Sequence, residues 1–162
     1  MNRKLINSAQ FTRVLTDPAN ATRQLLTLWG DVPLLLMLDV DWERGPLVLI
    51  GTSDYMMWPL YPPGSLLQLN PKLRTIAEGE WTEFERPVYL IEYDARFYCC
   101  YAQQKRQSLL LIPHEESPSR NIMTIPSKEG RVRGRLTPVF RPLATRGNAA
   151  GFNQQAKSRE RT

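Results

Sequence analysis

The stretch that most constrains the fold of this chain is residues 47–69, where two short apolar runs flank a turn-rich segment. The first run, Leu47–Ile50, ends at Gly51, and the second covers 65–69. Apolar runs of four or five residues bounded by Gly and Pro are typical of β-strands. Three prolines in the segment between them fix backbone angles and lower the entropy lost on ordering. The stretch therefore predicts a strand, a packed loop and a second strand.

Similar short runs recur along the chain and predict a mainly β fold. The run from Val88 to Ile91 is continuously apolar and rich in β-forming residues, which indicates a strand buried on both faces. Some of the polar segments between the runs are short enough to be hairpin turns. The expected strands are 87–93, 97–102, 108–112, 121–125 (a short edge strand at most) and 131–140, with polar turns at 94–96 and 103–107.

The N-terminal part of the chain predicts the main helical segment. Asp17 can cap a helix, Pro18 suits its first turn, and an apolar stripe that reaches Trp29 is ended by Gly30. We therefore expect a helix over 18–29. Five apolar residues further upstream also fit one helix face, and 33–42 is an apolar element that is either helix or strand. The upstream residues are Leu5, Ile6, Phe11, Val14 and Leu15.

A chain of 162 residues fits one domain with extra segments at its ends. We expect an N-terminal helical connector over 1–32, a β domain over 33–143 and a disordered basic tail over 144–162. Four cations and one anion give the tail +3 of the chain's net charge of +5. Such a tail either neutralises nucleic-acid phosphates or is a solvated end.

The composition also bears on where the chain works. No apolar run approaches the roughly 20 residues of a membrane-spanning helix. The first ten residues have no apolar segment of the length that a signal peptide needs. We therefore expect a cytoplasmic protein that makes no contact with a membrane.

The cysteines and the histidine give little support to metal or redox chemistry. Cys99 and Cys100 are adjacent, so on a strand they point to opposite faces and a disulfide between them would be strained. The simpler interpretation is two buried, inert thiols, because metal or redox sites need partners at ligand spacing. His114 is the single histidine. We expect no metal, no cofactor and no catalytic triad that needs histidine.

Residues 57–60 (MWPL) and 63–65 (PGS) resemble the active-site loop of LexA-type self-cleaving repressors and their phage-repressor relatives. Residues 22–37 (TRQLLTLWGDVPLLLM) resemble the connector of phage-repressor (XRE-type) transcriptional regulators with a LexA/UmuD-like C-terminal domain, and 83–92 (EFERPVYLIE) are also similar to this family. The resemblance runs from about Thr22 to Leu143. It implies a β-rich, partly open barrel preceded by a short helical segment.

The resemblance also places a catalytic pair. In that family a serine nucleophile stands directly before the methionine of the loop, and a lysine on a later strand takes its proton. With Met57, Pro59 and Gly64 aligned, the serine position holds Met56 and the lysine position falls at about Cys100. A thioether has no proton to lose and a thiol is no amine base. The resemblance thus implies a non-catalytic domain, its pocket either plugged by these side chains or kept as a groove for an extended peptide.

Two alternatives remain open. Ser53, beside Asp54, is a possible nucleophile for a residual serine (self-)protease. Arg131, Arg133 and Arg135 alternate with uncharged residues, so the period of two puts the three arginines on one face of a strand. That face is either exposed to solvent or binds an acidic partner, a dimer mate or, together with the basic tail, nucleic acid.

The resemblance further implies the sensor or dimerisation half of a transcriptional regulator. In that family a helix-turn-helix domain precedes the connector, whereas here only about twenty residues precede it. We therefore expect a domain without its own DNA reader that works through protein contact. The expected partner is a second copy of the chain or an intact regulator, with DNA contacted only indirectly or weakly.

Overall fold

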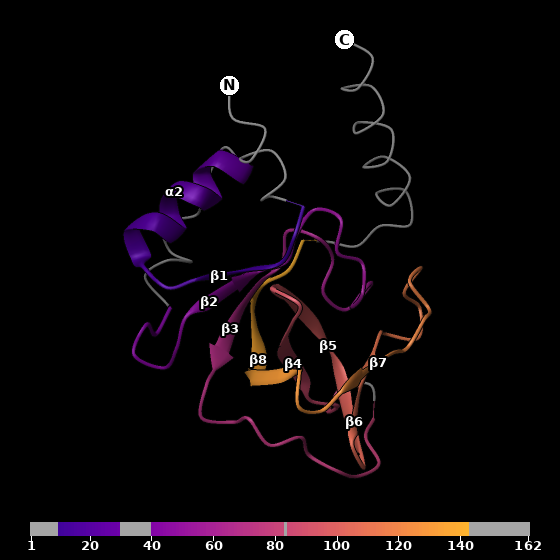
Figure 1. The fold of residues 1–162 in the computed structure, drawn as a ribbon. Coiled ribbons are helices and arrows are strands. Elements are labelled where there is room, and N and C mark those ends of the chain that lie inside the picture. Colours follow the sequence, from indigo (N-terminus) through magenta and orange to yellow (C-terminus); the bar gives the residue numbers. More distant parts are fainter. Residues whose placement is uncertain (1–9, 30–39, 83, 143–162) are drawn as a thin grey trace.

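The structure, a computed structural model, describes residues 10–29, 40–82 and 84–142. In these residues it is mainly β, as the sequence predicts, with eight antiparallel strands in one curled half-barrel sheet and a single helix (Figure 1). The sheet order is β1-β2-β3-β8-β4-β5-β6-β7. The elements are β1 (Arg13–Leu15), α2 (Pro18–Trp29), β2 (Leu47–Leu49), β3 (Leu66–Asn70), β4 (Val88–Tyr93), β5 (Arg96–Lys105), β6 (Ser108–Ile112), β7 (Met123–Pro126) and β8 (Arg131–Phe140).

Two ten-residue strands, β5 and β8, join the parts of the sheet. β8 pairs with β3 through residues 135–140 and with β4 through residues 131–136, so the last strand of the described chain lies in the middle of the sheet. β5 pairs with β4 through 96–100 and with β6 through 101–105. Since each long strand changes partner along its length, the sheet curls instead of lying flat (Figure 1).

Three apolar clusters fill the two faces of the sheet. The central cluster gathers one face of β2, β3, β4 and β5, the helix cluster lies between α2 and the β1–β3 end, and the hairpin cluster lies on the other face of β4–β7. Val88 and Leu90 belong to the central cluster, whereas Tyr89 and Ile91 belong to the hairpin cluster. Strand β4 is therefore buried on both faces, which explains its unbroken apolar sequence.

The helix begins where the sequence predicts. The carboxylate oxygens of Asp17 accept hydrogen bonds from the backbone N–H groups of Ala19 at 3.3 Å and Asn20 at 3.4 Å. These bonds pair two of the backbone donors that a helix leaves unsatisfied in its first turn. Ala21 and Leu25 lie one turn apart and are fully buried in the helix cluster. The N-cap and the apolar stripe thus dock α2 on the sheet.

The expected helix face upstream of Asp17 is wrong for Val14 and Leu15. Both lie on β1, which pairs with β2 in the register Arg13↔Leu49 to Leu15↔Leu47. Val14 packs against the central cluster and Leu15 is buried in the helix cluster, so successive side chains serve opposite faces. This alternation fits a strand and not a helix. Phe11 lies in a bend before β1 and is exposed, so it does not belong to a helix face either. Leu5 and Ile6 lie outside the described residues.

The hairpin turns need one correction. The turn at 94–96 is confirmed, with Asp94 at φ 50° and Ala95 at φ 58°, the left-handed angles of a two-residue hairpin turn. The predicted turn at 103–107 is too long, because Gln103, Gln104 and Lys105 continue β5 and only 106–107 turn. Their polar side chains are exposed while their backbone pairs with β6. The prediction therefore ended this strand too early, because it relied on the polarity of the side chains.

The remaining expected segments are partly outside the structure. The short strand at 121–125 is present as β7, which lies at one edge of the sheet. Of the element expected at 33–42, the structure describes Val40, which is buried in the helix cluster, and the start of a turn at 41–44. The tail at 144–162 lies outside the described residues. In the part of the chain that the structure describes, no helix has the length and apolar character needed to cross a membrane.

Gly134 marks an irregularity where β8 meets β4. Leu90 pairs with Gly134 but Ile91 pairs with Val132, so Arg133 is an extra residue in β8, which is a β-bulge. Gly134 has φ +154°, and a Cβ added there would overlap the carbonyl oxygen of Asn70 on β3. Both the backbone angle and the close approach of β3 therefore require glycine at this position.

We predict that Gly134→Ala lowers the free energy of unfolding by about 3 kcal/mol, or prevents folding, in urea titrations followed by circular dichroism. Gly79→Ala is the matched control, because Gly79 has a similar φ of +149° but an added Cβ would come no closer than 3.6 Å to the Trp81 ring. The control should lose only about 1 kcal/mol. Equal losses in the two variants would contradict the role assigned to the contact with Asn70.

Candidate functional site

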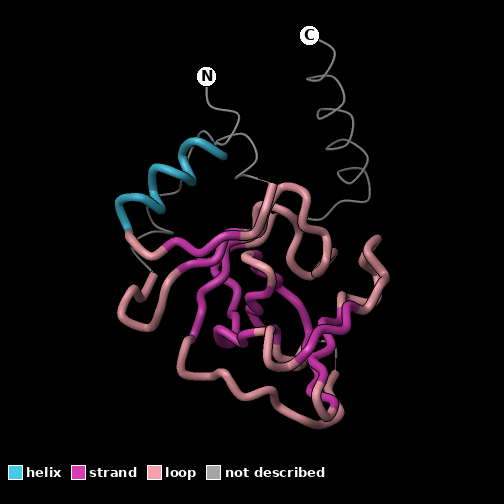
Figure 2. The backbone as a smooth tube through the Cα atoms, in the orientation of Figure 1, coloured by secondary structure: helices cyan, strands magenta, loops and turns pink. Residues whose placement is uncertain are grey.

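The loop between β2 and β3 contains no helix or strand (Figure 2) and is held by hydrogen bonds of its own backbone. The N–H of Tyr61 donates to the carbonyl of Met57 at 2.8 Å, and the N–H of Gly64 donates to the carbonyl of Ile50 at 3.0 Å. The hydroxyl of Ser65 donates to the carbonyl of Pro62 at 2.6 Å. Met57 is 1% exposed. This is the structured loop that the proline-rich sequence predicts.

The loop residues singled out by the resemblance lie on both sides of the sheet. Met57 belongs to the central cluster, which also contains Cys99, while Met56 packs against the hairpin cluster, which contains Cys100. Pro59 follows a cis peptide bond, and Gly64 has φ +85° where the loop returns to β3. Met56 and Cys100, the positions aligned with a nucleophile and its base, thus contribute to one apolar cluster.

The two cysteines are buried thiols on opposite faces of β5. Cys99 is 1% exposed and Cys100 is fully buried. Burial, and secondarily the nearby charge of Asp54, raises the pKa of both thiols above the usual value. Since the thiolate is the reactive and metal-binding form, burial and the raised pKa both disfavour reaction of these cysteines at neutral pH. Among the described residues, no group of three or more histidine, cysteine or acidic side chains could hold a metal ion.

Asp54 directs its carboxylate toward the segment before β1, although the sequence singled it out only as the neighbour of Ser53. Its carboxylate accepts a hydrogen bond from the hydroxyl of Thr12, whose oxygen in turn accepts the N–H of Gly51 at 3.3 Å. It also accepts the N–H of Met56 at 3.1 Å. Burial raises the pKa of Asp54, and these two hydrogen bonds oppose the shift. A partly buried carboxyl group therefore ties the start of the loop to the segment before β1.

Ser53, the alternative nucleophile, points the other way. Its hydroxyl donates to the carbonyl of Gln10 at 2.8 Å and its side chain is exposed. Lys105, the lysine nearest in sequence to the expected base position, ends β5 and pairs with Ser108 in the hairpin. The Nδ1 atom of His114 accepts the N–H of Glu116 at 3.1 Å, so that nitrogen serves the local turn. Ser53 thus lies in a turn, with its hydroxyl bonded to a backbone carbonyl.

The prediction that the three arginines of β8 share one face is wrong, because the β-bulge at Arg133 interrupts the alternation. Arg131 pairs with Glu92 and Arg135 pairs with Tyr89, and these two residues lie three positions apart on β4 and therefore face opposite sides of the sheet. A nitrogen of Arg133 lies 3.1 Å from a carboxylate oxygen of Glu92 on β4, and both side chains are partly exposed. The guanidinium of Arg135 lies 5.8 Å from the centre of the Tyr89 ring, and its Nε is buried without a hydrogen-bond partner among the described residues. Arg131 is exposed. Two of the three cations therefore contact β4, which limits what this strand can offer an anionic partner.

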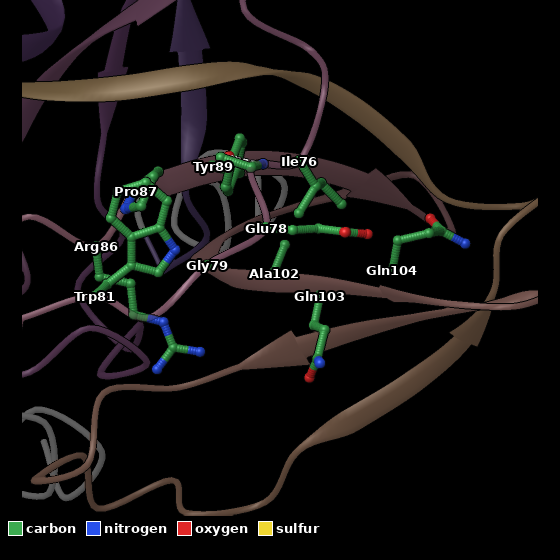
Figure 3. A pocket seen from close by; sticks show the side chains of 11 residues that line it. Ile76, Glu78, Gly79, Trp81, Arg86, Pro87, Tyr89, Ala102, Gln103 and Gln104 are labelled. Carbon is green, nitrogen blue, oxygen red and sulfur yellow. Dashed lines mark hydrogen bonds between the residues drawn. The ribbon is translucent and has the colours of Figure 1, made fainter.

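A cleft that the sequence did not reveal lies beside the second half of β5 (Figure 3). Its volume is about 530 Å³, which is within the usual range of ligand sites. One wall is the segment before β4 and the other is β5. The lining residues are Ile76, Ala77, Glu78, Gly79, Trp81, Arg86, Pro87, Tyr89, Ala102, Gln103 and Gln104.

The walls of the cleft are tied together by aromatic side chains. The hydroxyl of Tyr89 on β4 accepts the N–H of Ala77 at 2.8 Å, which anchors the wall segment. The guanidinium of Arg86 lies 4.3 Å from the centre of the Tyr101 ring, a cation–π contact. Trp81 is 42% exposed and stands at the Arg86 end of the cleft (Figure 3).

Comparison with known proteins does not assign the chain to a family. No protein-family model matches it, and no curated protein matches its sequence. The LexA-like resemblance therefore rests on the residues quoted for it and stays a prediction.

We predict that Asp54 makes the protein less stable as pH rises. The folded state raises the pKa of this carboxyl, so above the unfolded value of roughly 4 the folded chain binds more protons and the free energy of unfolding falls with pH. The Asp54→Asn variant keeps an acceptor for Thr12 and should lose this part of the pH dependence. Urea unfolding of both proteins between about pH 4 and pH 8 measures the difference.

Thr12→Val provides a second comparison. Removing the hydroxyl takes away a bond that lowers the pKa of Asp54, so the decline of stability with pH should become steeper than in the unmodified chain. If wild type and Asp54→Asn differ by the same amount at every pH, the carboxyl is not titrating in this range and the assignment fails.

Proposed function

We propose that this chain is a non-catalytic, LexA-like contact domain of a transcriptional regulator, which works by pairing with a second copy or with an intact homologous regulator. The observation that carries the proposal is the placement of Met56 and Cys100 in one apolar cluster. A serine–lysine pair needs a hydroxyl and a neutral amine that face each other. A thioether and a buried thiol at these places support packing as their role.

The surroundings of the loop support the same proposal. A protease needs an accessible nucleophile, whereas the backbone of Met56 accepts the N–H of His114 at 2.9 Å and is thereby joined to the segment after β6. The hydroxyl of Ser117 donates to the carbonyl of Tyr55 at 2.7 Å in the same place. Two hydrogen bonds thus join Tyr55 and Met56 to the segment after β6, which supports a packed role for this part of the loop.

We predict that fluorophosphonate and β-lactone probes do not label the protein between pH 6 and pH 9. Activated serines react with such probes, and the hydroxyl of Ser53 is bound to the carbonyl of Gln10. Intact mass spectrometry measures the labelling, and a serine hydrolase in the same reaction serves as the positive control. Labelling that disappears in Ser53→Ala would overturn the non-catalytic assignment and favour the protease alternative.

The sheet offers a surface for pairing at β7. β7 is an edge strand, paired only with β6 among the described elements, and Ile122 just before it is 54% exposed. An exposed edge next to an apolar side chain favours strand pairing between two chains. Pro126 lacks an N–H and ends the strand, which limits such pairing to its first residues.

We predict a dimer at micromolar concentration, measured as twice the mass of one chain by size-exclusion chromatography with light scattering. Ile122→Asp should shift the protein toward monomer, because a carboxylate would have to be desolvated in the interface. Leu73→Asp is the matched control, since Leu73 is 42% exposed on the loop after β3, away from β7 in the sheet order. A monomeric unmodified protein would contradict the proposed mode of action.

A further inference from the structure

Strand β5 extends beyond its neighbour β4, and one row of its backbone groups has no strand partner among the described residues. β4 supplies register partners only as far as Tyr89↔Cys100, while β5 continues to Lys105. Pro87 directly precedes β4 and has no N–H, so it cannot continue the ladder as a donor. The cleft of about 530 Å³ begins where this ladder stops.

The register tells which backbone groups face the cleft. In a two-residue hairpin, the two residues that flank the turn form a hydrogen-bonded pair. Hydrogen-bonded and non-hydrogen-bonded pairs then alternate along the two strands. The β4–β5 hairpin closes at Tyr93↔Arg96, so the even-numbered residues of β5 direct their N–H and C=O groups toward β4. The β5–β6 hairpin closes at Lys105↔Ser108, so the odd-numbered residues bond to β6. Both hairpins thus place the backbone groups of Ala102 and Gln104 on the cleft side.

The cleft is therefore a slot between two walls, one of which is the edge of strand β5. Ala102 and Gln104 both line it, and the side chain of Ala102 is a single methyl group. The wall segment opposite is held by the bond from Ala77 to Tyr89. Ala102 and Gln104 each offer one N–H and one C=O group, and the two residues are two positions apart. This spacing matches the repeat of an extended peptide backbone and does not match a compact small molecule.

The charges of the slot give the bound chain a direction. Arg86 stands at the end near Tyr101, and the carboxylate of Glu78 points toward Gln104 at the opposite end (Figure 3). A chain that prolongs β4 runs antiparallel to β5, so it enters at the Gln104 end and leaves at the Arg86 end. Its N-terminal part then lies near a carboxylate and its C-terminal part near a guanidinium.

We propose that this slot binds an extended peptide segment of a partner protein by strand addition to β5, antiparallel to it, with a basic residue followed two or three positions later by an acidic one. The exposed ring of Trp81 contacts the C-terminal half of the peptide. The slot can bind such a peptide in a monomer as well as in a dimer. Failure of dimerisation therefore does not count against the slot, and failure of peptide binding does not count against the dimer.

The test begins with a library of random heptapeptides displayed on phage and selected on the immobilised full-length chain. Enriched sequences should share the basic-then-acidic spacing and bind as free peptides with a Kd between about 1 and 100 µM by fluorescence polarisation. Selection without any enriched sequence family would overturn the proposal.

Variants of the chain locate the binding. Ala102→Pro removes the N–H that faces the slot but spares the β5–β6 ladder, so it should weaken binding at least about tenfold. Ala102→Ser is the matched control, because it keeps the N–H. Glu78→Lys should weaken binding of the selected peptides by a similar factor, whereas Glu80→Lys, the same change two residues away and not in the lining, should not.

Variants of the peptide test strand addition to β5 even if the Ala102→Pro protein fails to fold. N-methylation at alternate amides, those directed at β5, should abolish binding, while N-methylation of the amides between them should have little effect. A contact made only by side chains would lose affinity equally at both sets of amides. Equal losses, or unchanged affinity in Ala102→Pro and Glu78→Lys, would refute strand addition at this slot.

Discussion

The pairing of β8 with both β3 and β4 is the constraint on which the rest of the structure depends. Without it the β1–β3 part and the β4–β7 part of the sheet would share no strand in the described chain, since the sheet order places β8 between them. The junction is tight, because Gly134 packs against the carbonyl of Asn70. The insertion also buries Leu136 in the central cluster beside residues of β3 and β4. Leu136 on one face of β8 and Val132 on the other thus pack against the two clusters that cover the faces of β4.

Local sequence carried much of the fold but not its long-range assembly. The cap at Asp17 and the apolar run of β4 act within a few residues, so their effects were predictable. The insertion of β8 depends on partners more than sixty residues away for β3, and no local pattern encodes them. Strand β1 is only three residues long, too short for a period to be read, and pairing with β2 decides its conformation. The polar end of β5 was misassigned because backbone pairing with β6 outweighs side-chain propensity there.

In the region of the candidate site, too, local features could be predicted from the sequence and long-range contacts could not. The packed loop and the opposite-facing cysteines were predictable, because proline content and the period of a strand are local properties. The orientation of Asp54 was not, since its partner Thr12 precedes it by 42 positions. A loop with Ser-Asp in sequence is an ordinary turn, and only tertiary packing turns the carboxyl inward and leaves the serine outside. The structure thereby places the partly buried Asp54 carboxyl near two buried thiols. Burial raises the pKa of all three groups, which favours their neutral forms.

The cleft beside β5 follows from the same long-range geometry. A sheet usually protects its edges, with charges, prolines or covering loops. Here the β4 ladder ends at Tyr89↔Cys100, next to Pro87, and the cleft separates β5 from a segment that the bond from Ala77 to the Tyr89 hydroxyl anchors. Moving the segment inward to pair with Ala102 would break that bond and fill the space that Trp81 and Arg86 border. The edge is therefore neither paired nor buried but held open at a width that the wall sets. Such an opening in an otherwise continuous antiparallel sheet is a place where another extended chain can complete the ladder.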